Sequence, residues 1–135
     1  MIKRQVALYL LMIFTTAIFA DGPDYPVIYR DLGLPEYQNA EVTSVGRDNT
    51  SLRDGIRITL LTQDDDATIR AYYEAEMQDR GWVLEETVAS KNMRAAGLLD
   101  KMPFTATFNK DDMRYRASAN RGDNGTVIQI NLLEE

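Results

Sequence analysis

The chain has 135 residues and a formal net charge of −6 at pH 7, and it contains no Cys and no His. Ser–His and Cys–His nucleophile pairs, zinc sites built on those side chains and disulfide bridges are therefore excluded. Nucleic acid and anionic membrane surfaces repel an acidic chain, so we expect no nucleic-acid partner.

Residues 1–20, MIKRQVALYLLMIFTTAIFA, have the pattern of an export signal. Lys3 and Arg4 give a positive start, and an apolar run with a shorter mixed stretch leads to Ala20. Because Ile18 is bulky for a position just before a cleavage site, two outcomes stay open: cleavage after Ala20, or retention as an anchor helix. Either way we expect the rest of the chain to be exported. The protein is then periplasmic or secreted, or is anchored to the inner membrane through residues 1–20.

Residues 21–36, DGPDYPVIYRDLGLPE, carry three Pro and two Gly, which predicts an extended lead-in rather than a regular element. The segment is too apolar for a free tail. We expect part of it to pack on the domain that follows, or to form a contact surface for a partner. Residues 37–135 then suit a single domain with one core.

Two strands are predicted next, over residues 40–46 and 56–62, with a turn-rich connection between Gly46 and Gly55. In the second strand, apolar residues from Ile56 to Leu60 alternate with polar ones. This alternation is typical of a half-buried antiparallel strand.

A helix is predicted over residues 65–80. Asp65 is the expected N-cap, because an Asp there accepts hydrogen bonds from free amides of the first turn. Gly81 fits the left-handed position after the last turn, so that Trp82 folds back onto the helix. One apolar stripe faces the core, and Arg70 is expected on the polar side with Glu74, Gln78 and Asp79. The stripe consists of Ile69, Tyr72, Tyr73 and Met77.

After the helix, a strand is predicted over 82–89, and a meander of strands over 104–109, 113–119 and 126–133. Turns are predicted over 109–112 and 120–125, where Asn-Gly is a strong hairpin signal.

Residues 90–103, SKNMRAAGLLDKMP, are ambiguous. They form a loop, a short helix that covers a sheet edge, or a segment that docks a partner, since exposed Met and Leu adapt to varied surfaces. The partner-binding candidates in this segment are Met93, Leu98, Leu99 and Met102.

The predicted fold class is α+β. An antiparallel sheet of five or six strands, in the chain order ββαββββ, carries one main helix on one face, and the N-terminal signal or anchor helix precedes it. The predicted core consists of Ile56, Ile58, Leu60, Ile69, Tyr73, Met77, Trp82, Phe104, Phe108, Tyr115, Ile128 and Ile130.

Catalytic signals are sparse. No Gly-rich phosphate loop or dinucleotide fingerprint is present, and we expect no cofactor, no metal site and no enzymatic activity. The acids that a hydrolase would pair fall in predicted caps and turns, where Asp is expected for backbone reasons. They are Asp64, Asp65, Asp66, Asp111 and Asp112.

Arg57, Arg114 and Arg116 fall on the polar faces of predicted strands. If those strands are neighbours, the three side chains form a basic stripe on an acidic protein. The stripe is either a solvated sheet face paired with acids or a site for an acidic ligand or partner, because Arg grips carboxylates with two parallel hydrogen bonds.

The segments YQNAEV (37–42) and TQD (62–64), followed by Ile69, Tyr72-Tyr73, Met77 and Gly81-Trp82, form a pattern over residues 35–133. This pattern resembles uncharacterised bacterial exported and lipoprotein-type envelope domains that read Y-P-G-A-x-V, T-x-D and F-Y-x-x-x-L-x-x-x-G-W. The chain departs from them at Gln38 and Asn39, and it lacks their lipid-bearing Cys. The resemblance implies an exported α+β domain and brings no catalytic residues.

Together these patterns predict a non-enzymatic periplasmic or cell-envelope binding or scaffold module that acts through protein–protein contacts. An envelope protein is the expected partner, and the open sheet face or residues 90–103 the expected surface. The alternatives are an exported domain that binds a small ligand between helix and sheet and, more remotely, a carboxylate-based hydrolase.

Overall fold

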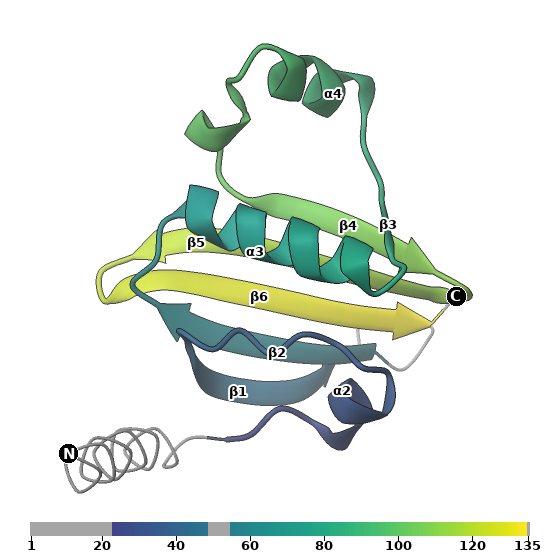
Figure 1. The fold of residues 1–135 in the computed structure, drawn as a ribbon. Helices are drawn as coiled ribbons and strands as arrows, with labels where there is room; N and C mark the ends of the chain where they lie inside the picture. The colour runs from purple at the N-terminus through teal and green to yellow at the C-terminus, as the bar shows by residue number, and fades with distance from the viewer. Residues whose placement is uncertain (1–22, 49–54, 135) are drawn as a thin grey trace, which may run out of the picture.

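A six-stranded antiparallel sheet forms the centre of the part of the chain that the structure, a computed structural model, describes: residues 23–48 and 55–134 (Figure 1). The strand order is β1-β2-β6-β5-β4-β3. The elements are α2 (Val27–Asp31), β1 (Glu41–Asp48), β2 (Gly55–Thr62), α3 (Asp66–Asp79), β3 (Val83–Leu84), α4 (Val88–Ala95), η2 (Leu99–Lys101), β4 (Thr105–Lys110), β5 (Met113–Gly122) and β6 (Gly125–Glu134). The predicted α+β class is confirmed. The predicted leader and residues 49–54 of the turn-rich connection lie outside the described residues.

The last strand of the chain lies in the middle of the sheet. β6 pairs with β2 on one side, where Ile130 lies opposite Ile58, and with β5 on the other, where it lies opposite Ala117. Only residues 123–124 separate β5 from β6, so the turn is shorter than the predicted 120–125. The two ends of the domain are therefore joined by strand pairing.

Helix α3 lies across one face of the sheet (Figure 1). The side chain of Asp65 accepts a hydrogen bond from the Thr68 amide (2.9 Å). At the other end, Gly81 has φ +87 and the Trp82 amide donates to the Met77 carbonyl at 3.0 Å. This is the Schellman ending that the sequence predicts. No helix within residues 23–48 and 55–134 is long and apolar enough to cross a membrane.

One hydrophobic core lies between α3 and the sheet. The predicted core residues are buried, except that Ile56 is only half-buried. Tyr29 and Leu34 join the core from the lead-in, which confirms that part of that segment packs on the domain, and Tyr37 joins it from the start of the domain itself. The predicted exposure of Arg70 is wrong, because its side chain bonds to the carbonyls of Met102 and Pro103 and the residue is 6% exposed.

The lead-in contains a short helix, α2, where extended chain is predicted. Pro26 is its N-cap, and Gly33, with φ +65, follows its last turn. The Leu34 amide then donates to the Tyr29 carbonyl (2.8 Å). Pro and Gly thus mark the two ends of a helix, and burial of the Tyr29 ring holds it against the domain.

The strand predicted over residues 82–89 is wrong in extent, because β3 ends at Leu84. The Thr87 side chain accepts a hydrogen bond from the Ser90 amide (3.1 Å) and caps α4. The local capping signal therefore overrides the weak alternation of this stretch. The short helix was one of the alternatives for residues 90–103.

Candidate functional site

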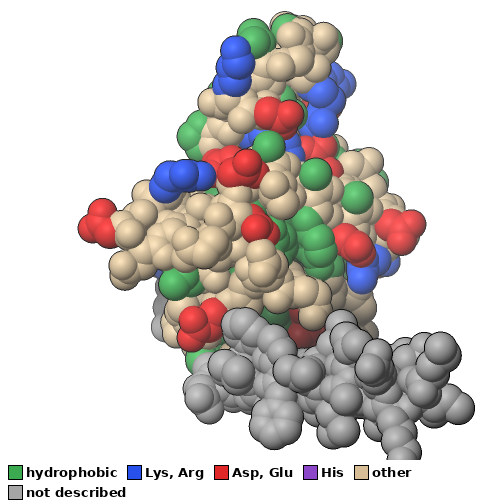
Figure 2. Space-filling model, turned by 60° about the vertical axis from the view of Figure 1, so that its left-hand side comes forward, with side chains coloured by type: hydrophobic (Ala, Val, Ile, Leu, Met, Phe, Trp, Pro, Cys, Tyr) green, Lys and Arg blue, Asp and Glu red, His purple; other side chains and the backbone are tan. Residues whose placement is uncertain are grey.

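Residues 87–102, which we call the arm, connect β3 to β4 and stand out beyond the sheet (Figure 1). Neither α4 nor η2 buries a side chain, and Leu98 and Met102 are 39% and 43% exposed. Basic side chains gather on the arm, and acidic ones lie near its junction with the body (Figure 2). Polar contacts, more than apolar packing, therefore hold the arm in place.

The first set of contacts comes from Arg70 on α3. Its Nη2 donates to the carbonyls of Met102 (3.2 Å) and Pro103 (3.3 Å), and its guanidinium lies 5.8 Å from the centre of the Phe104 ring. Nη1 lies 3.5 Å from a carboxylate oxygen of Asp100 but makes no hydrogen bond, although it is buried. Arg70 thus anchors the end of the arm, and its Nη1 is ion-paired with Asp100 without a hydrogen bond.

The second set comes from Arg94 on α4. Its guanidinium forms ion pairs of 2.7 Å with Glu74 on α3 and with Glu86 at the base of the arm. Partial burial lowers the pKa of Arg94, but the bonds and charges of Glu86 and Glu74 outweigh this effect and raise it. Two arginines, one on each side, therefore link the arm to α3.

A groove of about 340 Å³ lies between the arm, α3 and the edge of β4; we call it the arm groove. Leu84, Leu99 and Ala106 supply its apolar lining, and Thr105 and Thr107 its strand edge. Most of the remaining lining is charged, with four arginines and three glutamates. These are Arg70, Arg94, Arg114, Arg116, Glu74, Glu85 and Glu86.

The arm groove contains an open stretch of sheet edge. β3 pairs with β4 only at Asn109 and Phe108, and one further bond runs from the Glu85 amide to the Thr107 carbonyl (2.8 Å). The chain then leaves the sheet to form the arm. Thr105, at the start of β4, therefore lies beyond the end of β3.

The four apolar candidates of the arm separate in the structure. Leu99 lines the arm groove, whereas Leu98 is exposed and lies outside its lining. Met93 is half-buried within α4. Met102 lines a different hollow, beside the start of α3. Of these predicted residues, Leu99 alone takes part in the arm groove.

The three candidate arginines lie on the sheet face opposite α3, but not on neighbouring strands. β6 separates Arg57 on β2 from Arg114 and Arg116 on β5. The register places Arg57, Asn131 and Arg116 in one row across the sheet, and Arg57 Nε donates to Asn131 Oδ1 at 3.1 Å. The structure thus brings Arg114 and Arg116 to the arm groove and leaves Arg57 away from it.

Sequence reasoning missed Arg70, Arg94 and Glu74 as groove residues. The spacing of Arg70 and Glu74 at i and i+4 fits an ordinary exposed helix pair, and they are 4.0 Å apart. The side chain of Arg94 comes to Glu74 only because the arm folds back over α3. Apart from the i, i+4 spacing, no local pattern in the sequence signals this group.

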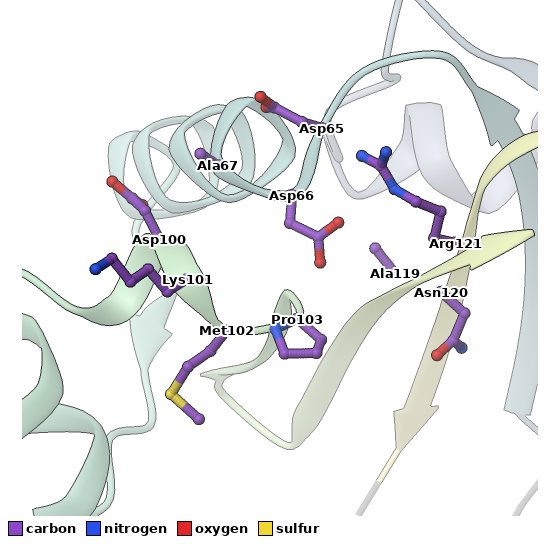
Figure 3. Close-up of a pocket in the computed structure, with 10 residues that line it drawn as sticks. All are labelled: Asp65, Asp66, Ala67, Asp100, Lys101, Met102, Pro103, Ala119, Asn120 and Arg121. Carbon is purple, nitrogen blue, oxygen red and sulfur yellow. The ribbon is translucent and has the colours of Figure 1, made fainter.

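A second hollow, of about 400 Å³, lies at the start of α3 and includes Asp65, Asp66 and Asp100 in its lining. Asp66 lies between Asp100 on one side and Arg121 on the other (Figure 3). Its Oδ2 accepts a hydrogen bond from the Phe104 amide (2.7 Å). The pKa of Asp65 is lowered, mainly by its hydrogen bonds from Thr68. Two of these acids therefore serve backbone amides.

Asp64 also has a structural role. It accepts a short hydrogen bond from the Tyr37 hydroxyl and another from the Asn39 amide group (2.8 Å). Asp111 and Asp112 form the exposed turn between β4 and β5. Within residues 23–48 and 55–134, no three acidic side chains gather in a way that could hold a metal ion.

Side chains fill the interface between α3 and the sheet. Ile69, Tyr73 and Met77 are fully buried, and Trp82 and Tyr115 pack in the same layer. Burial raises the pKa of Tyr73 and Tyr115 well above the ordinary value. The alternative predicted from the sequence is a small-ligand site between helix and sheet. Because side chains fill that region, the arm groove is the better place for a ligand.

Comparison with curated proteins and with solved structures finds no match. A family model described as START domain-like matches residues 42–131, from β1 to β6, and this range contains the whole arm groove. Because the match covers well over half of the 135 residues, the chain belongs to the START domain-like family.

Proposed function

We propose that the domain is a non-enzymatic binding module that holds a partner protein in the arm groove. Arg116 carries the proposal. Its side chain is exposed, lines the arm groove, and forms no hydrogen bond or ion pair with any other described residue. Membership in the START domain-like family also favours a ligand-binding module.

The charges of the arm groove indicate an acidic partner. Glu74 and Glu86 are engaged by Arg94, and Glu85 accepts a hydrogen bond from Asn109 (3.2 Å). The acids of the lining thus have partners, whereas Arg116 remains available to a carboxylate. Because Arg116 is exposed, we expect binding to weaken as the salt concentration rises.

The pattern of residues 1–20 leads us to propose that this contact takes place outside the cytoplasm, with an envelope protein of a bacterium. The leader is either removed after Ala20 or kept as an anchor. Mass spectrometry of the N-terminus of the protein, isolated from its own cells, would report which. An intact N-terminus in a cytoplasmic fraction would contradict export.

Capture of partners by the full chain, with matched variants, tests the proposal. Arg116→Glu and Leu99→Asp alter the lining of the arm groove, whereas Arg57→Glu and Leu98→Asp change the same residue types outside it. We expect the first pair to lose the captured partner and the second pair to retain it. A partner that all four variants capture equally would refute a binding role for the arm groove.

A small anionic ligand is the second candidate, favoured by the Nη1 group of buried Arg70, which is ion-paired with Asp100 but forms no hydrogen bond. A volume of about 340 Å³ falls within the range of about 300–1,000 Å³ that ligand pockets occupy. Thermal-shift screening with mono- and dicarboxylates tests this alternative. A rise in melting temperature that Arg116→Gln abolishes and Arg57→Gln preserves would support it, and no rise with any compound would exclude this class.

A further inference from the structure

We infer that the occupant of the arm groove is an extended peptide segment with alternating acidic and apolar residues, which adds as a strand to the open edge of β4. This inference rests on the proposed function, because it names the partner's chemistry and its mode of binding at the same site. Three features of the arm groove lead to it: the direction of the backbone groups at the edge, the two different faces, and the contrast with the other edge of the sheet.

The register fixes which backbone groups of β4 point into the arm groove. The Phe104 carbonyl accepts a hydrogen bond from the Ala119 amide (2.9 Å), so residue 104 is bonded towards β5. In an antiparallel ladder the next residue turns its amide and carbonyl the other way. The backbone amide and carbonyl of Thr105 therefore point away from β5. The Thr107 carbonyl points the same way and accepts a hydrogen bond from the Glu85 amide. Because β3 ends before Thr105, an added strand can continue the sheet here.

The two faces of the open edge differ in chemistry. Arg116 lies opposite Thr107 in the β4–β5 register, and Arg114 lies next along the same face. On the α3 face, Ala106 and Leu84 line the arm groove, and Leu99 lines it from the arm. Side chains of a strand alternate between the two faces. A segment that pairs with Thr105 and continues from it along the arm groove would therefore present alternate residues to the arginines and to the apolar lining.

The opposite edge of the sheet differs in two ways. β1 pairs with β2 through a register shift between Val42 and Ser44, and a bulge of this kind bends an edge and discourages the addition of another strand. β4 pairs with β5 without such a shift from Thr105 to Lys110. The regular edge is therefore the one that lies within the arm groove.

Binding of a fluorescent peptide to the full chain tests the inference. The probe is a short blocked peptide that alternates glutamate and valine. A second probe carries N-methyl groups on the amides that would face β4, so that it keeps every side chain but cannot form the strand bonds. We expect the first to bind and the second to bind at least about tenfold more weakly, because each strand bond removed also leaves an unpaired group. Equal binding of the two would overturn strand addition.

Matched protein variants test the site. Arg116→Gln should weaken binding of the first probe about tenfold, whereas Arg57→Gln, in the same row of the same sheet, should leave it unchanged. Bound probe should also slow amide exchange at Thr105. An equal loss in both variants, or unchanged exchange at the Thr105 amide, would overturn the assignment to this edge.

The outcome also separates this inference from the proposed function. If neither probe binds while partner capture still depends on Arg116 and Leu99, the strand mode is wrong and the binding module stands. If partner capture is independent of both residues, the proposed function itself fails.

Discussion

Replacement of Arg70 by Met should release the arm without unfolding the domain. The change removes the hydrogen bonds from Nη2 to the carbonyls of Met102 and Pro103, which at 3.2 and 3.3 Å are long. We therefore take about 1.5 kcal/mol for each, the low end for bonds from a charged donor. The guanidinium contact with the Phe104 ring, at 5.8 Å, adds about 0.5–1 kcal/mol.

One term opposes this loss. A buried guanidinium carries a desolvation penalty that Met does not, and Met keeps much of the aliphatic contact. We expect a net weakening of arm docking by about 2–3 kcal/mol, which corresponds to about a 30- to 150-fold change in the docking equilibrium. Because α4 and η2 bury no side chain, the opening should remain local.

Amide hydrogen exchange measures this effect residue by residue. The amides of Lys101 and Met102, which bond to Leu98 and Leu99 within the arm, should exchange at least about tenfold faster in Arg70→Met. Exchange in β2 and β6 should stay close to that of the wild type. Unchanged exchange at Lys101 and Met102, or an equal acceleration across the whole domain, would refute the reasoning.

Arg80→Met is the matched control. Arg80 is the C-cap of α3. Like Arg70 it donates to a backbone carbonyl outside the helix, from Nε to Gly33 (2.8 Å), but it does not touch the arm. Its replacement should accelerate exchange of the Leu34 amide, which closes α2, and leave the arm unaffected. Loss of arm protection in this control as well would mean that the end of α3, rather than the Arg70 contacts, controls the arm.

Three further predictions concern the core and one turn. Tyr73→Phe should raise the free energy of unfolding by about 1 kcal/mol, because the Tyr73 hydroxyl is buried without a hydrogen-bond partner. Tyr29→Phe removes a hydroxyl that is bonded to another tyrosine, so it should not raise the free energy of unfolding. Urea unfolding of both variants checks this. Gly125→Ala should destabilise by about 2–4 kcal/mol, because φ is +134 and the new Cβ would lie 2.7 Å from the Thr62 carbonyl oxygen; wild-type stability would disprove the clash. Burial raises the pKa of Tyr29 and Tyr73 above the ordinary value of 10.0. The contribution of these neutral phenols to the free energy of unfolding is therefore complete below about pH 10 and is lost as the pH rises through the folded-state pKa. The urea midpoint should fall above about pH 10, and its fall with pH should be shallower in both Phe variants.

Features that depend on neighbours in the sequence could be predicted. The bounds of α3 follow from Asp65 at one end and from Gly81 and Trp82 at the other, and each acts within one turn of the helix. The apolar alternation of β2 and β6 likewise follows from which side of the strand faces the core.

Features that depend on distant residues could not be predicted in this way. Alternation placed Arg57 and Arg116 on polar strand faces, but no local pattern indicates that β6 separates their strands. The burial of Arg70 has the same origin. Helical periodicity places it on the solvent side, and only the return of the arm at Met102 and Pro103 covers it. The arm groove was therefore missed because distant contacts build it.

The two segments that carry the resemblance to envelope domains, 37–42 and 62–64, contact each other. Tyr37 and Asn39 bond to Asp64, and the Thr62 hydroxyl donates to the Asn39 carbonyl (2.6 Å). These bonds fix the turn before β1 to the start of α3. A sequence pattern made of such residues therefore indicates the fold and does not identify the partner.

The division of stability within the domain follows from these contacts. The sheet and α3 are held by a fully buried core, whereas the arm is held by Arg70 and Arg94 with no buried side chain of α4 or η2. Segments with few buried apolar contacts open at low free-energy cost. The arm can therefore shift to admit an occupant while β4 and its open edge stay in place. A rigid edge beneath a loosely held arm suits recognition of an extended segment, because the edge supplies register and the arm adapts to side chains.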